Sequence, residues 1–110
     1  MAERAEGRFP RRRDRHRLVR FAWYQEIGVR TEGGLARSTD LTENGIGLIA
    51  ARPIDLGARV FVQLALPAEL ISVVARIVHA RGEGALFRLG LAFEIVSPTD
   101  RATLRRVLGS

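Results

Sequence analysis

Alternation of apolar and polar residues runs through most of the chain after Leu18, and it constrains the fold more than any other feature. In the first run, Val19, Phe21 and Trp23 alternate with more polar or smaller neighbours, and the pattern continues to Val29. A repeat of two residues places successive side chains on opposite faces of a β-strand. After a turn at Gly33-Gly34, residues 35–41 form the return leg, so residues 19–41 predict a β-hairpin.

Four further segments predict four more strands, at residues 46–52, 59–66, 70–81 and 85–95; residues 59–66 and 85–95 alternate, whereas residues 70–81 form a longer apolar run. Turn signals separate them, including Asn44-Gly45 before the third strand and residues 82–84 before the last. The last strand alternates most regularly, with one side formed by Phe87, Leu89, Leu91, Phe93 and Ile95.

The period changes near the C-terminus, where residues 98–108 predict a short amphipathic helix. Ser97 offers a hydroxyl for the N-cap, Pro98 suits the first helical position, and Asp100 places a carboxylate in the first turn. Six consecutive antiparallel strands would leave two exposed edges in an open sheet, and closure into a barrel removes them. The expected fold is therefore all-β: a six-stranded antiparallel β-barrel with a C-terminal α-helix.

Three side chains in the strands call for separate predictions. Trp23 and Tyr24 must point to opposite faces, and we expect Trp23 to pack in the core. His79 lies within a strand without an acid or a nucleophile visibly placed beside it, so it is expected to be a structural or barrel-lining residue and not a catalyst.

Positive charge is concentrated at the N-terminus. The chain has 110 residues and a formal net charge of +6, and residues 1–20 contain eight arginines against three acidic residues. The remaining residues are nearly balanced, with ten arginines against nine acidic residues. Because a run of like charges repels itself, residues 1–10 are predicted to be a flexible tail and residues 11–17 a flexible, arginine-rich arm.

Composition argues against several classes of function. There is no cysteine, so disulfides and thiolate chemistry are excluded, and the two histidines, His16 and His79, cannot form a metal site alone. We expect no metal, no cofactor and no enzymatic activity. The sequence contains neither the apolar run of a membrane span nor a signal peptide, so a cytoplasmic location without membrane insertion is predicted.

The segment Asp40-Leu41-Thr42-Glu43-Asn44-Gly45-Ile46-Gly47 is the second informative feature. Taken alone it reads as a hairpin turn, because Asn-Gly favours tight turns and the Asp and Thr side chains bond their own backbone. However, it also places a carboxylate, a hydroxyl and two glycines one hairpin downstream of the arginine cluster. Together, the two segments could surround an anionic ligand.

These two segments resemble the motifs of the PilZ domain family, RxxxR near the start and (D/N)xSxxG on the barrel. Arg13 and Arg17 supply the first motif, with Arg12 preceding it as in many members, although Arg11 and Arg15 form a rival pair. Residues 40–45 supply the second motif, with threonine in place of the usual serine, and Gly47 completes the GxG that often follows. The resemblance covers residues 11–110, which would form one domain.

The resemblance implies a bacterial receptor for the second messenger cyclic di-GMP. Arg12, Arg13 and Arg17 would bind guanine edges and phosphates, as planar guanidinium groups can. Asp40 would accept hydrogen bonds from guanine, Thr42 would bond phosphate or the base edge, and Gly45 and Gly47 would let the backbone approach the ligand. Ligand binding would order the arm and signal to an unidentified downstream protein.

Two other functions remain open at this point. A nucleic-acid-binding barrel would use the arm to neutralise phosphates, but the body of the chain is nearly neutral and aromatic residues make up only 6% of it. Nucleic acid is therefore not the expected partner, because such barrels usually pair a basic groove with stacking aromatic side chains. The other alternative is a PilZ-like adaptor that contacts proteins without binding a ligand.

Overall fold

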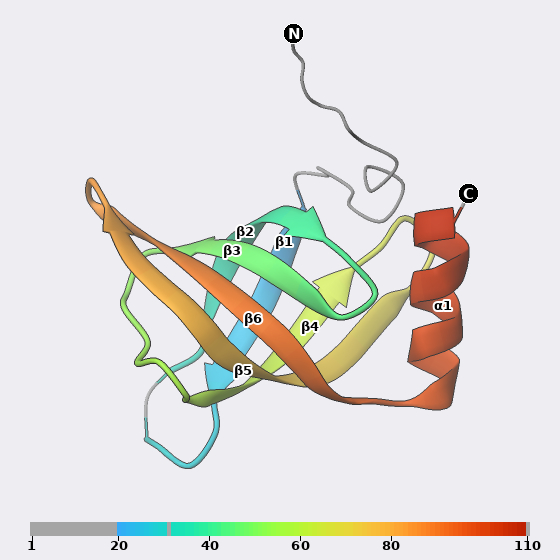
Figure 1. The fold of residues 1–110 in the computed structure, drawn as a ribbon, viewed down its shortest axis with the longest axis horizontal. Coiled ribbons are helices and arrows are strands. Elements are labelled where there is room, and N and C mark those ends of the chain that lie inside the picture. The colour runs from blue at the N-terminus through green and yellow to red at the C-terminus, as the bar shows by residue number, and fades with distance from the viewer. Residues whose placement is uncertain (1–19, 31, 110) are drawn as a thin grey trace, which may run out of the picture.

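The computed structural model describes residues 20–30 and 32–109, and within these residues the chain forms six strands and one helix. The strands close into an antiparallel barrel in the order β1-β2-β3-β6-β5-β4, with α1 at one end (Figure 1). The predicted barrel with a C-terminal helix is confirmed, whereas the predicted tail and arm lie outside the described residues. The elements are β1 (Phe21–Glu26), β2 (Gly34–Leu41), β3 (Gly45–Ala50), β4 (Arg59–Ala65), β5 (Leu70–Glu83), β6 (Leu86–Val96) and α1 (Pro98–Gly109).

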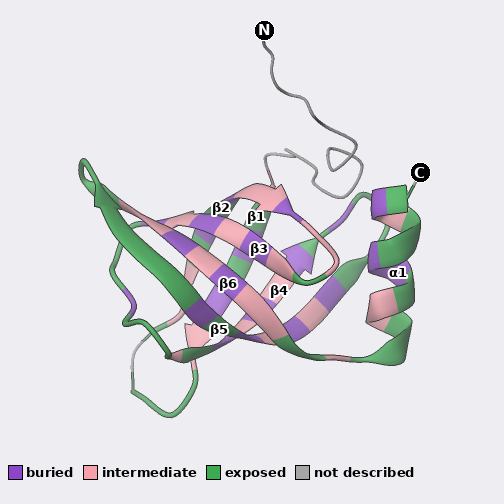
Figure 2. Cartoon of the chain, in the orientation of Figure 1, coloured by how far each residue is buried: buried purple, intermediate pink, exposed green. Residues whose placement is uncertain are grey.

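Inward-facing aliphatic side chains fill the barrel. Every second residue of β3 and β4 is buried, as the bands of Figure 2 show, because successive residues of a strand face opposite sides. The largest fully buried side chains on the strands are those of Leu48, Val60, Val62, Ile71, Ile77 and Leu89, and Leu104 of α1 is buried as completely. The apolar alternation in the sequence therefore locates most of the core correctly.

The first strand is shorter than predicted. It ends at Glu26, whereas the alternation suggested that it would continue to Val29. Gly28 has a φ of 87°, which turns the chain away from the sheet just after the amide of Ile27 donates to the carbonyl of Arg59. Ile27 and Val29 therefore lie in the turn, where both are exposed.

The predicted burial of Trp23 is wrong. Its neighbour Tyr24 points into the barrel and is 5% exposed, whereas Trp23 is on the outer face and is 39% exposed. The indole lies against Gly33, where an added Cβ would come within 2.4 Å of a ring carbon. Trp23 thus packs on backbone outside the barrel and not on the core.

The expected single apolar face of β6 is interrupted by a β-bulge. Val74 pairs with Ile95 while the next residue of β5, Ala75, pairs with Phe93, so Glu94 is the extra residue. An extra residue reverses the side-chain alternation beyond it. Ile95 was expected to share a face with buried Leu91, but it points outward and is 56% exposed.

Helix α1 is fixed to the barrel by apolar and polar contacts. Ser97 caps its N-terminus as predicted, since the Oγ accepts a 3.0 Å hydrogen bond from the Asp100 amide. The Asp100 carboxylate accepts from the Ser72 amide of β5 at 3.2 Å, which ties the first helical turn to the barrel. Leu104 is completely buried and Leu108 nearly so.

Replacing Leu104 by alanine should destabilise the fold by about 2–5 kcal/mol, because the change leaves a cavity between helix and barrel. Chemical denaturation followed by circular dichroism measures the change in unfolding free energy. Leu56→Ala is the matched control, since Leu56 is 64% exposed and should lose less than about 1 kcal/mol. Equal losses in the two variants would mean that α1 contributes little to the stability of the barrel.

Candidate functional site

An open cavity of about 550 Å³ lies on the outer wall of the barrel, over four neighbouring strands. β2 and β3 provide one side of it, and β5 and β6 provide the other. The lining residues are Thr39, Asp40, Gly47, His79, Ala80, Arg81, Arg88, Leu89 and Gly90. Two of the predicted site residues, Asp40 and Gly47, are therefore brought together in one cavity.

A single row of cross-strand partners runs through the cavity. Asp40 pairs with Gly47, Gly47 with Gly90, and Gly90 with His79. Since neighbouring strands are about 4.8 Å apart, the row spans roughly 14 Å of sheet. A carboxylate and an imidazole thus stand at the two ends of a trough whose centre is two glycines, and we call this set of four residues the glycine row.

Two β-bulges turn the ends of the glycine row outward. Ser38 pairs with Leu48 and Asp40 with Gly47, which leaves Thr39 as an extra residue in β2. Similarly, Ile77 pairs with Leu91 and His79 with Gly90, which leaves Val78 as an extra residue in β5. Ser38 and Ile77 are buried, so strict alternation would also direct Asp40 and His79 inward. The bulges reverse this direction at both ends of the row.

The carboxylate of Asp40 lies close to Gly47. The Thr39 hydroxyl donates to Asp40 Oδ1 at 3.0 Å, and a Cβ added to Gly47 would be 2.5 Å from the same oxygen. The same Cβ would come within 2.4 Å of the Thr39 hydroxyl oxygen. Glycine at position 47 is therefore needed for the observed position of this acceptor group.

His79 occupies the opposite end of the trough and was not predicted as a site residue. Its ring lies over Gly90, where an added Cβ would be 3.1 Å from a ring carbon. The sequence predicted a structural or barrel-lining residue at this position, but the bulge between Ile77 and His79 places the side chain on the outer wall. A glycine within a regular strand often marks a close approach, so Gly90 was the sequence signal that could have identified this position.

A second outward-facing row beside the glycine row carries arginines. Arg37 pairs with Ile49, Ile49 with Arg88, and Arg88 with Arg81, across the same four strands. Of these, Arg81 and Arg88 line the cavity. The trough therefore has hydrogen-bond acceptors at the Asp40 end and guanidinium groups along one side, which suits a ligand that has both donors and negative charge.

Glu83 restrains the arginines at this side of the cavity. Its carboxylate accepts from Arg88 through two bonds of 2.9 and 3.2 Å, and it lies 3.5 Å from Arg81. Hydrogen bonding from Arg88 holds the pKa of Glu83 below its ordinary value, and Glu83 in turn raises the pKa of Arg88. Both side chains are open to solvent in part, with 42% of Arg88 and 46% of Glu83 exposed, so an incoming anion can compete with Glu83 for Arg88.

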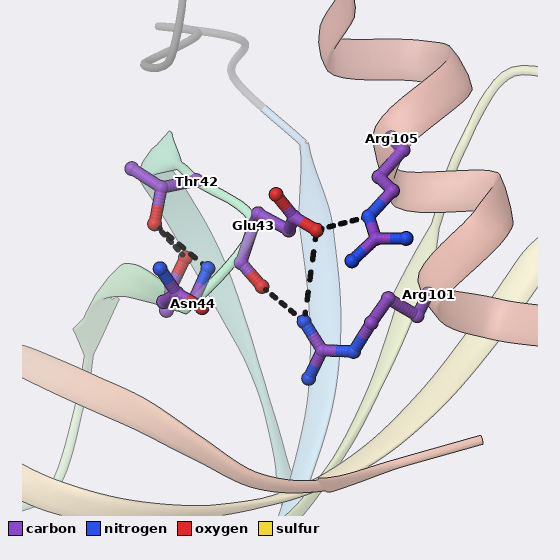
Figure 3. A network of polar contacts seen from close by, with 6 residues as sticks. Thr42, Glu43, Asn44, Arg101 and Arg105 are labelled. Carbon is purple, nitrogen blue, oxygen red and sulfur yellow. Dashed lines mark hydrogen bonds and ion pairs between the residues drawn. The ribbon is translucent and has the colours of Figure 1, made fainter. Parts of the chain in front are cut away.

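The other predicted residues of the second motif form the turn between β2 and β3 (Figure 3). Thr42 accepts a 3.2 Å hydrogen bond from the Asn44 amide through its Oγ1, and its own amide donates to the Gly45 carbonyl at 2.9 Å. Gly45 lies against β6, where an added Cβ would be 2.4 Å from the Leu91 carbonyl oxygen. Thr42 and Gly45 do not line the cavity described above. The predicted Arg12, Arg13 and Arg17 lie outside the described residues.

The outward-facing cavity combines apolar and backbone surface with a few charged and polar side chains, which is the usual make-up of a small-molecule site. No group of three or more His, Asp or Glu side chains suited to a metal occurs among residues 20–30 and 32–109. Within the same residues, no helix has the length and apolar character of a membrane span.

The chain belongs to the PilZ domain family, because the family model for the PilZ domain matches residues 10–110. No curated protein matches the sequence.

Solved structures share the fold at low sequence identity. The motility inhibitor MotI (DgrA) of Bacillus subtilis has 16% identity and a TM-score of 0.76, over 86% of this chain and 47% of that one. The PilZ domain of YcgR from Escherichia coli, solved with c-di-GMP, has 19% identity and a TM-score of 0.62, over 79% of each chain. The MrkH–c-di-GMP complex of K. pneumonia has 18% identity and a TM-score of 0.70, over 91% of this chain and 52% of that one. The present chain thus spans about half the length of MotI and MrkH.

The pKa of Glu83 provides a test of the cavity's electrostatics. Because its folded pKa is lowered, the ionised carboxylate stabilises the fold above its unfolded pKa, and this contribution is lost as the pH falls through the folded value. Titration followed by NMR should therefore show Glu83 ionising below its ordinary value, and Arg88→Gln should raise that pKa.

Arg76→Gln is the matched control for this titration. Arg76 is hydrogen-bonded to Glu94 at 2.6 Å and lowers the pKa of that carboxyl. The control variant should raise the pKa of Glu94 and leave that of Glu83 unchanged. An unshifted Glu83 in the Arg88→Gln variant would contradict the ion pair at the cavity.

Proposed function

We propose that this protein is a receptor for cyclic di-GMP and that the glycine row is part of its binding site. The observation that carries the proposal is that Asp40, from the family's second motif, and Gly47, from the GxG that follows it, line one outward-facing cavity of a PilZ domain. The c-di-GMP-bound structures of the YcgR PilZ domain and of MrkH, which share this fold, support the same ligand class.

The chemistry of the cavity suits this ligand. Cyclic di-GMP has two guanines and two negatively charged phosphates, so a receptor needs an acceptor for guanine N1 and N2 hydrogens and donors for O6, N7 and phosphate. Asp40 supplies the acceptor. The glycines at 47 and 90 leave the sheet surface low between Asp40 and His79, so that a flat base can approach the backbone.

The arm is joined to the barrel close to this site, so a short length of backbone separates its arginines from the cavity. Arg20, which begins the described region, accepts a 2.7 Å hydrogen bond from the Ser38 amide, and its own amide donates to Ser38 Oγ at 3.1 Å. The chain thus enters the barrel beside Ser38, two residues before Asp40. Arg17 is three residues before Arg20, which corresponds to at most about 11 Å of extended backbone. In the proposed complex Arg13 and Arg17, preceded by Arg12, bind guanine and phosphate.

Thr42, Gly45 and Gly47 complete the proposed contacts from the barrel. Thr42 would offer its hydroxyl to phosphate or to a base edge, while Gly45 and Gly47 keep the backbone of β3 accessible. Each glycine also has a structural reason for its identity, since a Cβ at 45 would meet Leu91 and a Cβ at 47 would meet Asp40. Ligand binding and strand pairing would therefore both require glycine at positions 45 and 47.

The proposed output is a change in the arm. A segment with eight arginines against three acidic residues gains order when an anion neutralises it, and the ordered arm then presents a new surface to a downstream protein. This mechanism requires no catalysis and no cofactor other than the ligand. It accounts for an arginine surplus confined to the N-terminal residues of an otherwise balanced chain.

Isothermal titration with cyclic di-GMP tests the proposal, with GMP and cyclic GMP as controls. Asp40→Ala and Arg17→Ala should each weaken binding about 5- to 150-fold, the equivalent of about 1–3 kcal/mol for a lost guanine contact. The Arg4→Ala/Arg8→Ala variant is the matched control, because this pair has the same spacing and lies outside the proposed motif. Absence of binding by the parent protein would falsify the proposal.

The same titration at two salt concentrations separates the receptor from a nucleic-acid-binding barrel. Affinity for a nucleic-acid polymer falls steeply with salt because many counterions are released, whereas a dinucleotide with two phosphates should show a shallow dependence. Single-stranded oligonucleotides serve as the comparison ligand. Tight, salt-sensitive oligonucleotide binding without cyclic di-GMP binding would favour the alternative.

Gly47→Ala should weaken cyclic di-GMP binding at least tenfold while the barrel stays folded. The new methyl group would displace the ends of the Thr39 and Asp40 side chains, which can move, so the effect on stability should stay below about 2 kcal/mol. Titration calorimetry and thermal unfolding measure the two effects. The Gly109→Ala variant is the control, because no atom lies within 4 Å of a Cβ at that position.

A further inference from the structure

The side chain of Glu43 connects the turn between β2 and β3 to helix α1 (Figure 3). It lies between two arginines of the helix, with its Oε2 in an ion pair with Arg105 Nε and 3.9 Å from Arg101 Nη1. Arg101 also donates to the backbone carbonyl of Glu43 at 3.4 Å. The helix therefore contacts both the side chain and the backbone at the tip of this turn.

Helix α1 is anchored to the barrel by contacts that do not involve the turn. Leu104 is completely buried, and the Asp100 carboxylate accepts from the Ser72 amide. Thr103 donates to Glu69 at 3.0 Å, and Arg106 forms an ion pair with the same carboxylate. Consequently Arg101 and Arg105 extend from a fixed support.

The turn is thus held from two directions. On the barrel side, the Phe93 amide of β6 donates to the Asn44 carbonyl at 2.8 Å. On the helix side, Arg101 and Arg105 hold Glu43, the residue next to Thr42. Positions 101 and 105 are one helical turn apart, so their side chains lie on the same face and can hold one carboxylate between them.

We infer that Glu43, Arg101 and Arg105 are positioning residues for the cyclic di-GMP site. They hold the turn that carries Thr42 in one conformation before ligand arrives. The inference rests on the proposed function, in which Thr42 bonds the ligand. A turn that is already ordered loses less conformational freedom on binding, and this difference appears as affinity.

The sign of the effect distinguishes positioning from simple electrostatics. Glu43→Gln removes one negative charge and releases two arginines near the site, so charge alone would make a dianionic ligand bind more tightly. Loss of positioning predicts weaker binding. Exposed ion pairs contribute little individually, so we expect Glu43→Gln to reduce the affinity for cyclic di-GMP by only about three- to tenfold.

Glu94→Gln is the matched control for this experiment. Glu94 is likewise a carboxylate held by two arginines, Arg59 at 3.1 Å and Arg76 at 2.6 Å, but these lie on β4 and β5 and not on α1. Both substitutions change the net charge equally. We expect Glu43→Gln to bind cyclic di-GMP about three- to tenfold more weakly than Glu94→Gln, and the charge-swapped Glu43→Arg/Arg105→Glu variant to recover most of the loss seen in Glu43→Arg.

Hydrogen exchange without ligand separates this inference from the proposed function. The amides of Thr42 and Asn44, which are bonded within the turn, should exchange faster in Glu43→Gln than in Glu94→Gln. Equal exchange rates, or binding by Glu43→Gln as tight as that of Glu94→Gln, would overturn the positioning role. A parent protein that binds no cyclic di-GMP would instead overturn the proposed function, and with it the role of these residues in binding.

Discussion

The alternation of side chains in a closed barrel is the constraint on which the rest of this structure depends. Each strand must send every second side chain into a filled interior, so polar groups can face outward only where the alternation allows it. The extra residues Thr39 and Val78 shift that alternation once in β2 and once in β5. The candidate site therefore exists because two strands depart from regular pairing at the two ends of one cross-strand row.

Three glycines near the site serve three separate physical needs. Gly45 permits β3 to pair closely with β6 at Leu91, Gly47 makes room for the Asp40 carboxylate, and Gly90 lies beneath His79. None of the three has a positive φ, so close approach explains them and turn geometry does not. A glycine in a ligand-binding motif can thus be required by close contacts within the sheet as well as by contacts with the ligand.

The sequence predicted the six strands, the capped helix and the closed barrel, because each follows from local periodicity and local turn chemistry. It singled out Asp40, from the second motif, and Gly47, from the GxG that follows, and both residues line one cavity in the structure. It misplaced Ile95 and did not place His79 at the cavity. A β-bulge is set by pairing between distant strands, and the apolar–polar pattern of a single strand does not reveal it. The contact between Glu43 and α1 could not be predicted from the sequence either. Glu43 is separated along the chain from Arg101 by 58 positions and from Arg105 by 62.

The distribution of charge suggests how barrel and arm would share the work of binding an anion. In the barrel and helix, carboxylates already hold many arginines: Glu43, Glu69, Glu83 and Glu94 each pair with at least one. The surplus of arginine lies in residues 1–20. A ligand with two phosphates would therefore find shape and hydrogen-bond acceptors on the barrel but most of its neutralising charge on the arm. In the proposed mechanism, such a division would make the position of the arm depend on the ligand.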